Sequence, residues 1–132
     1  IVMLQYSTEY EQILREAKDR DICLYEAERN YLAATHAEVG LWLAQKWRFP
    51  ANLVEAIGFH HQPQSARQAP LETAIVHVSD ILVRAKGVGF AGDLFVPAVH
   101  PATWEMLQLS EEDVNAILTQ IEESASMTKE EI

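Results

Sequence analysis

Four of the five histidines and one internal aspartate fall within a 45-residue stretch, at 35–40, 58–61 and 77–80. Imidazole nitrogens and carboxylate oxygens are ligands for divalent metals, and such a mixed set suits Mn, Fe, Zn, Ni or Mg with different strengths. The residues that would suffice for one ion are His36, His60, His61 and Asp80. These four are the candidate metal ligands.

The consecutive pair His60 and His61 places a geometric condition on that site. Two successive residues of an α-helix point about 100° apart, because each turn takes 3.6 residues. Both imidazoles can reach one ion only where the helix ends. We therefore expect the helix before His60 to finish at this pair.

The elements that would position these side chains all read as helices. Capping-box pairs at Thr8 with Glu11 and at Thr35 with Glu38 predict two helix starts, and Pro50 and Pro70 suit the first positions of two more. Residues 1–6 read as the end of an earlier element, and 87–97 as a loop. No strand pattern or repeat is present, so the predicted fold class is all-α, with helices over about 9–19, 24–33, 36–47, 50–61, 71–86, 100–107 and from 111 onward.

The helix predicted over 71–86 is apolar on nearly all sides, which indicates a central, buried element. Its broad apolar stripe is Leu71, Ala74, Ile75, Val78, Ile81, Leu82 and Ala85, and a second face carries Thr73, His77, Asp80 and Arg84. A carboxylate inside a buried helix is costly unless it is paired or bound to a metal. Asp80 should therefore contact a cation: His36, His60, His61, Arg84 or a metal.

Three of the four candidate ligands also have a structural interpretation. His61 at a helix C-terminus would interact favourably with the helix dipole, His36 would pack in a first turn, and Asp80 would form an internal ion pair. His77 and His100 are interpreted as structural residues. Trp42, Trp47 and Trp104 are expected in the core or at an interface.

Composition excludes several classes of function. The 132 residues are enough for a single domain with a real core. The net charge of −10 and only ten scattered Lys and Arg residues argue against a nucleic-acid partner. No apolar run approaches the roughly 20 residues that span a bilayer, so no membrane anchor is expected. The single cysteine, Cys23, fits a buried thiol in a reducing cytoplasm.

Four pieces together resemble the C-terminal half of an HDOD domain, the HD-related output domain of bacterial signalling proteins. They are 36–40 (HAEVG), Trp47 with Pro50, 56–63 (AIGFHHQP) and 75–80 (IVHVSD). The resemblance covers about residues 5–125 and implies a helical bundle of the HD-domain, phosphodiesterase-like type. It implies one HDOD-like domain over 1–132, lacking its N-terminal part. In the similar HD and HD-GYP metal phosphohydrolases, the positions matching His36, His60, His61 and Asp80 bind metal.

The sequence departs from those catalytic relatives in two places. It contains no adjacent His-Asp dyad, and Gln62-Pro63-Gln64 follows the histidine pair where a Gly-Tyr-Pro signature would stand. The resemblance therefore implies a non-catalytic cytoplasmic signalling module without catalytic residues or an obligatory cofactor. Its expected partners are other signalling proteins or domains, or a second copy in a homodimer. The alternative is a metal-dependent phosphohydrolase acting on nucleotides or cyclic dinucleotides.

Overall fold

The computed structural model describes residues 7–130, with side chains described over 7–127. These residues form α-helices joined by loops, with one short 3-10 helix and no strand in the described part, which confirms the all-α prediction. The element predicted at 1–6 lies outside the described residues. The helices are α2 (Ser7–Arg20), α3 (Leu24–Tyr31), α4 (His36–Lys46), α5 (Ala51–Phe59), η1 (Pro63–Ser65), α6 (Pro70–Ala85), α7 (Pro101–Leu107) and α8 (Glu111–Glu130).

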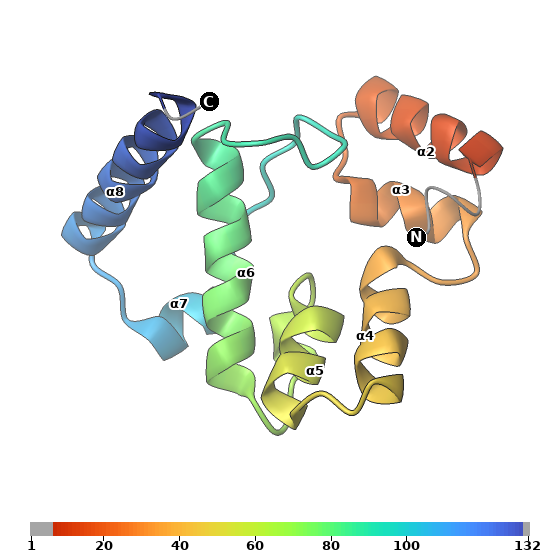
Figure 1. Ribbon diagram of the computed structural model, residues 1–132, viewed down its shortest axis with the longest axis horizontal. Coiled ribbons are helices and arrows are strands. Elements are labelled where there is room, and N and C mark those ends of the chain that lie inside the picture. The colour runs from red at the N-terminus through yellow and green to blue at the C-terminus, as the bar shows by residue number, and fades with distance from the viewer. Residues whose placement is uncertain (1–6, 131–132) are drawn as a thin grey trace.

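Helix α6 is the central element of the fold, as its apolar sequence predicts (Figure 1). It contacts α5, η1, α7 and α8, whereas α4 reaches it through α5. Helices α2 and α3 pair with each other, and the chain from α6 to α7 passes close to them (Figure 1). The buried apolar residues of the α2–α3 pair are Tyr10, Ile13, Ala17, Leu24 and Ala27.

Glycines at the α4–α5 contact explain how closely these two helices pack. A Cβ added to Gly40 would lie 2.7 Å from Ile57 Cγ2, and one added to Gly58 would clash with the side chain of Leu41. Any larger residue at these positions would force the helices apart. The contact brings the first residue of α4 towards the end of α5.

The predicted helix ends are largely confirmed. Thr35 and Glu38 form the full capping box of α4, with Thr35 Oγ1 accepting from the Glu38 N–H. Ser110 and Asp113 cap α8 with reciprocal hydrogen bonds. Helix α2 begins at Ser7, so Thr8 lies inside it rather than capping it from outside.

Several predicted inward faces are wrong. On α6 the buried positions are Thr73, Ala74, His77, Val78, Ile81 and Leu82, whereas Leu71, Ile75 and Ala85 are exposed. The polar residues Thr73 and His77 are buried because each has a backbone hydrogen-bond partner, which removes the cost of burying them. The three tryptophans lie outside the core, with Trp42 56% and Trp47 60% exposed, so of their two predicted positions only the core is wrong.

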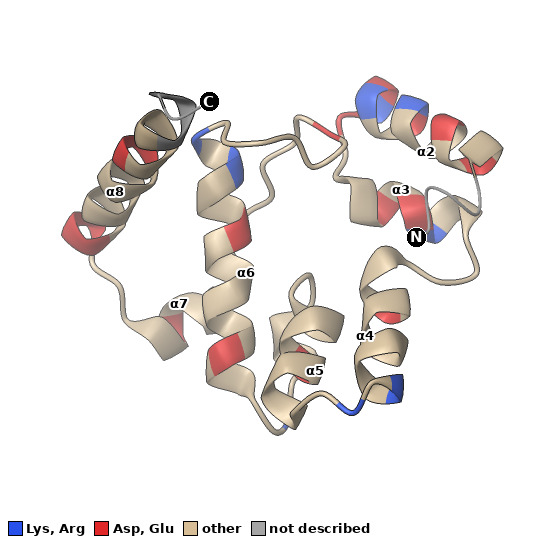
Figure 2. Cartoon of the chain, viewed as in Figure 1, with Lys and Arg blue, Asp and Glu red and all other residues tan. Residues whose placement is uncertain are grey.

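Charged residues are spread over several helices, and the small groups of Lys and Arg at the ends of α2 and α6 lie apart from one another (Figure 2). This distribution agrees with the sequence argument against a phosphate-backbone partner. Within the described residues, every helix is too short or too polar to cross a lipid bilayer.

Glu55 on α5 joins that helix to the start of α6. It is buried, and its carboxylate accepts hydrogen bonds from the backbone N–H groups of Arg67, Gln68 and Ala69, the closest at 2.7 Å. Burial raises the pKa of the Glu55 carboxyl, but these N–H groups outweigh burial and hold the pKa below its usual value. The ionised carboxylate therefore stabilises the turn that leads into the central helix.

We expect Glu55→Gln to lower the free energy of unfolding by about 1.5–3 kcal/mol, the usual contribution of hydrogen bonds to a charged group. Because the folded-state pKa is depressed, the stabilisation is present above the unfolded glutamate pKa of about 4.3. It is lost as pH falls from there through the folded pKa. Urea titrations of wild type and Glu55→Gln at pH 7 and at lower pH would measure this.

The matched control is Glu105→Gln, since Glu105 is exposed and makes no hydrogen bond or ion pair within the described residues. It should change stability by no more than about 0.5 kcal/mol. A stability difference between wild type and Glu55→Gln that does not shrink in acid would contradict the account.

Candidate metal centre

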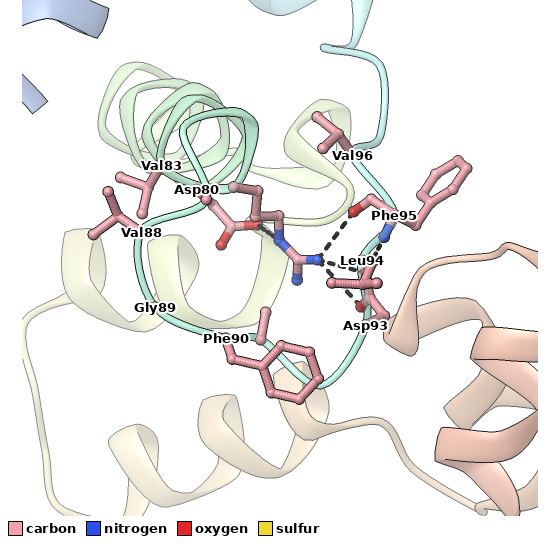
Figure 3. A pocket seen from close by; sticks show the side chains of 12 residues that line it. Asp80, Val83, Val88, Gly89, Phe90, Asp93, Leu94, Phe95 and Val96 are labelled. Carbon is pink, nitrogen blue, oxygen red and sulfur yellow. Dashed lines mark hydrogen bonds and ion pairs between the residues drawn. The ribbon is translucent and has the colours of Figure 1, made fainter. Parts of the chain in front are cut away.

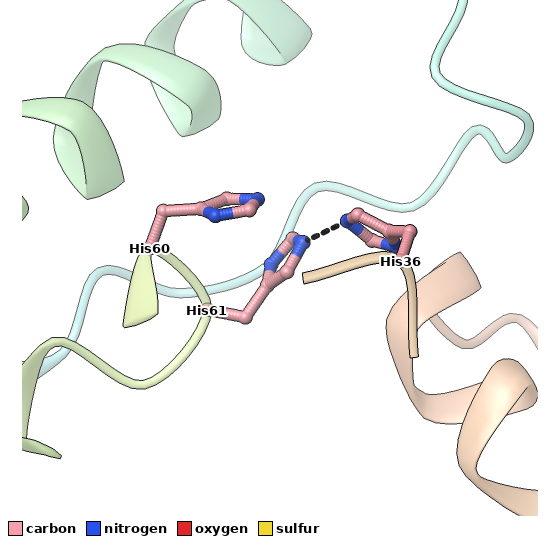
Figure 4. A group of neighbouring side chains, drawn as sticks. All are labelled: His36, His60 and His61. Carbon is pink, nitrogen blue, oxygen red and sulfur yellow. Dashed lines mark hydrogen bonds between the residues drawn. The ribbon is translucent and has the colours of Figure 1, made fainter. Parts of the chain in front are cut away.

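Three of the four predicted ligands come together at one place. His36 is the first residue of α4, and α5 ends at Phe59, so the chain turns at His60 and His61 as their spacing requires. The three side chains His36, His60 and His61 each offer a nitrogen, and these nitrogens all lie within 4.8 Å of one another (Figure 4). We refer to them as the histidine cluster.

A buried carboxylate orients the first of these imidazoles. Glu28 on α3 is 0% exposed, and its Oε2 accepts hydrogen bonds from His36 Nδ1–H at 2.6 Å and from the His36 backbone N–H at 2.9 Å. Its Oε1 accepts from the Tyr10 hydroxyl at 2.9 Å. Burial raises the pKa of Glu28, but the His36 contacts outweigh burial and leave the pKa below its usual value. The bond at Nδ1 leaves the Nε2 lone pair of His36 facing the cluster.

Hydrogen bonds also assign the tautomers of the other two imidazoles. His60 Nδ1–H donates to the Ile57 carbonyl at 2.8 Å, so its Nε2 carries the lone pair. His61 Nε2 lies 2.9 Å from His36 Nε2, and it donates there because His36 has its proton on Nδ1. Burial, together with the nearby His60 and His36, lowers the pKa of His61 to about 2. His61 is therefore a neutral imidazole at pH 7, the form that binds metals.

The donor set fits one divalent ion. Two imidazole nitrogens bound to a tetrahedral zinc ion stand about 3.3 Å apart, given Zn–N bonds near 2.0–2.1 Å, and the His36–His61 separation is close to that value. Metal binding would displace the proton that these nitrogens share. A carboxylate hydrogen-bonded to a ligand imidazole, as Glu28 is to His36, is the usual supporting arrangement of such sites. Three imidazoles favour Zn, Ni or Fe over Mg, which prefers oxygen.

Asp80, the fourth predicted ligand, does not join the histidine cluster. Its carboxylate accepts a hydrogen bond from Arg84 Nε at 3.2 Å, and Arg84 also donates to both oxygens of Asp93 (Figure 3). The expectation that Asp80 contacts a cation is confirmed, and that cation is Arg84, one turn along α6. Burial lowers the pKa of His60, and the Ile57 carbonyl and Asp80 only partly oppose this.

A cavity of about 400 Å³ lies beside the histidine cluster. Its lining includes His61, Tyr25, Asp80, His77 and His100. The Tyr25 ring stacks on His61, with centroids 4.6 Å apart, and so covers one face of that ligand. Of the histidine cluster, His61 is the member that lines this cavity, so a small molecule or water in it would lie beside that imidazole.

Two acidic residues of this region, Glu28 and Asp93, were not predicted from the sequence. Glu28 lies one turn after Leu24, at a spacing of four, on the buried side of α3, so a charge in an apolar stripe was the available signal. Asp93, whose side chain is 1% exposed, lies in the loop after α6 and accepts the Leu24 N–H at 2.8 Å. No local pattern marks a loop residue whose partners are 9 and 69 positions away.

We expect Glu28→Gln, in metal-free protein, to lower the free energy of unfolding by about 1.5–3 kcal/mol, because the hydrogen bonds from Tyr10 and His36 lose their charged acceptor. Urea denaturation in the presence of a chelator measures this. Glu26→Gln, an exposed position on the same helix, is the control and should stay within about 0.5 kcal/mol of wild type. Equal effects of the two variants would show that Glu28 has no special role.

Comparison with known protein families gives a match over the first part of the chain. The HDOD domain family matches residues 1–63, a range that includes all three members of the histidine cluster but not Asp80. No match was found among curated proteins or among solved structures. The all-helical fold agrees with an HD-like helical domain. Over residues 1–63, just under half of its length, this chain is similar to the HDOD domain family.

Proposed function

We propose that the protein is a non-catalytic module of bacterial signalling, derived from the HD phosphohydrolase fold and acting through contacts with other proteins in the cytoplasm. The observation that carries this proposal is the pairing of Asp80 with Arg84. Because Asp80 is paired with Arg84, the histidine cluster contains three imidazoles and no carboxylate within the described residues. Two-metal hydrolysis needs ligands that hold a second ion, and this set supports one.

Exposed aromatic residues near the α4–α5 turn support a role in protein contacts. Trp47 and Phe49 are 60% and 43% exposed, and their rings lie 6.0 Å apart. Leu53, early in α5, is also exposed. Large aromatic side chains on a surface are typical anchors of protein interfaces. The partners we propose are other signalling proteins or domains, or a second copy of this chain.

A metal-dependent phosphohydrolase acting on nucleotides or cyclic dinucleotides is the second candidate function. The histidine cluster and its adjoining cavity favour it, since a substrate phosphate could lie beside the cluster. A divalent metal held by His36, His60 and His61 would supply an activated water as nucleophile. The chain itself would contribute the oriented imidazoles, with His36 held by Glu28 and His61 covered by Tyr25.

We expect the protein loaded with Zn²⁺ or Mn²⁺ to hydrolyse cyclic dinucleotides and nucleotide phosphoesters no faster than His61→Ala treated in the same way. Without a second ion and a carboxylate ligand, the cluster lacks the usual means of stabilising the leaving oxygen. Product formation is measured by chromatography, with elemental analysis of each sample. Turnover that disappears both in His61→Ala and after chelation would establish the second candidate instead.

Trp47→Ala should weaken self-association while leaving the fold intact. We expect a homodimer in sedimentation equilibrium, and a loss of about 30-fold in affinity, which corresponds to a 2 kcal/mol hot spot. Stability should change by no more than about 0.5 kcal/mol, because the indole is largely exposed. Leu94→Ala, at an 87% exposed position elsewhere, is the control. A monomeric wild type would remove the second copy as the partner of this surface.

A further inference from the structure

His77 on α6 links the histidine cluster to a distant part of the chain. Its side chain is buried, and both ring nitrogens have backbone partners from other segments. Nδ1–H donates to the His60 carbonyl at 2.6 Å, and Nε2 accepts from the His100 N–H at 3.0 Å. Both nitrogens are occupied, so His77 is not itself available as a ligand.

We propose that His77 is a positioning residue for the histidine cluster, holding the His60 carbonyl so that His60 and His61 both face His36. The three rings are also the candidate metal site, and the inference concerns a residue outside that ligand set. In this role, His77 on α6 is a neutral imidazole with its proton on Nδ1.

The need for such a residue follows from the helix end. The last carbonyls of an α-helix have no N–H partner within the helix, so their direction is set by whatever else bonds to them. Phe59 O accepts from the Gln62 N–H, and His60 O accepts from His77. Because His60 and His61 are joined by the peptide that carries this carbonyl, rotating it would turn the two imidazoles relative to each other. Fixing the carbonyl therefore fixes both rings.

Burial and the surrounding groups agree with this role. Burial lowers the pKa of His77, and the His60 carbonyl and Asp80 only partly oppose this, so the ring stays neutral. A neutral ring can donate at one nitrogen and accept at the other, as both backbone partners require. A protonated ring would donate at both and lose the bond from the His100 N–H.

Two substitutions separate the bonds of His77. The amide nitrogen of Asn in His77→Asn lies near the position of Nδ1 and can still donate to the His60 carbonyl. The amide of Gln in His77→Gln lies near the position of Nε2 and can accept from the His100 N–H but cannot reach the His60 carbonyl. Each variant keeps one bond and loses one, so a purely structural role would affect both alike.

The experiment measures Zn²⁺ affinity by calorimetry, with the Co²⁺ absorption spectrum as a second probe. We expect His77→Gln to bind zinc about 10–100-fold more weakly than wild type, the usual effect of losing a residue that supports a ligand. His77→Asn should bind nearly as well as wild type. Urea denaturation of both metal-free variants checks that they fold and lose similar stability.

A measurement on the metal-free protein tests the positioning role of His77 separately from metal binding. Proton NMR of the metal-free protein should show a contact between the His36 and His61 rings, retained in His77→Asn and lost in His77→Gln. If wild type binds no zinc but the NMR difference is seen, the metal site fails and the positioning role stands. If both variants keep the ring contact, or if both bind zinc as wild type does, the positioning role is overturned.

Discussion

The buried carboxylate of Glu28 is the constraint on which the site depends. A charge with no exposure to solvent is tolerated only when hydrogen bonds replace its water, and here they come from Tyr10 on α2 and His36 on α4. One side chain on α3 thus joins the α2–α3 pair to the helix that carries the first cluster histidine. The same bonds select the tautomer of His36, so the stability of this junction and the orientation of a candidate metal ligand have a common cause.

A second buried acid explains why Asp80 lies apart from the histidines. Asp93, in the loop after α6, accepts from the Leu24 N–H, the Phe95 N–H and Arg84, and its side chain is 1% exposed. Arg84 must therefore extend towards Asp93, and Asp80 lies one turn before it on α6, within reach of the same guanidinium. A permanently charged guanidinium is a stronger partner for a carboxylate than neutral imidazoles are. Asp80 therefore pairs with Arg84 and not with the histidines.

The five histidines divide into roles according to what occupies their ring nitrogens. His36, His60 and His61 each direct one nitrogen into a shared space. His77 has both nitrogens bonded to backbone groups, and His100 accepts the Ala102 N–H at the start of α7. Residue type alone does not distinguish a ligand from a positioning residue. The distinction comes from the partner of the second nitrogen, which is set by packing.

The sequence alone determined the helical class and most helix ends, and it singled out His36, His60 and His61 as candidate ligands. These depend on local rules: capping boxes, prolines at helix starts, apolar spacing, and a small residue at Gly40 where α5 approaches. Tertiary structure alone decided that Glu28 and Asp93 are buried, that Trp47 is exposed, and that Asp80 pairs with Arg84. The physical reason is that a buried charge is stabilised by partners from distant segments, and periodicity along one helix carries no information about which partners those will be.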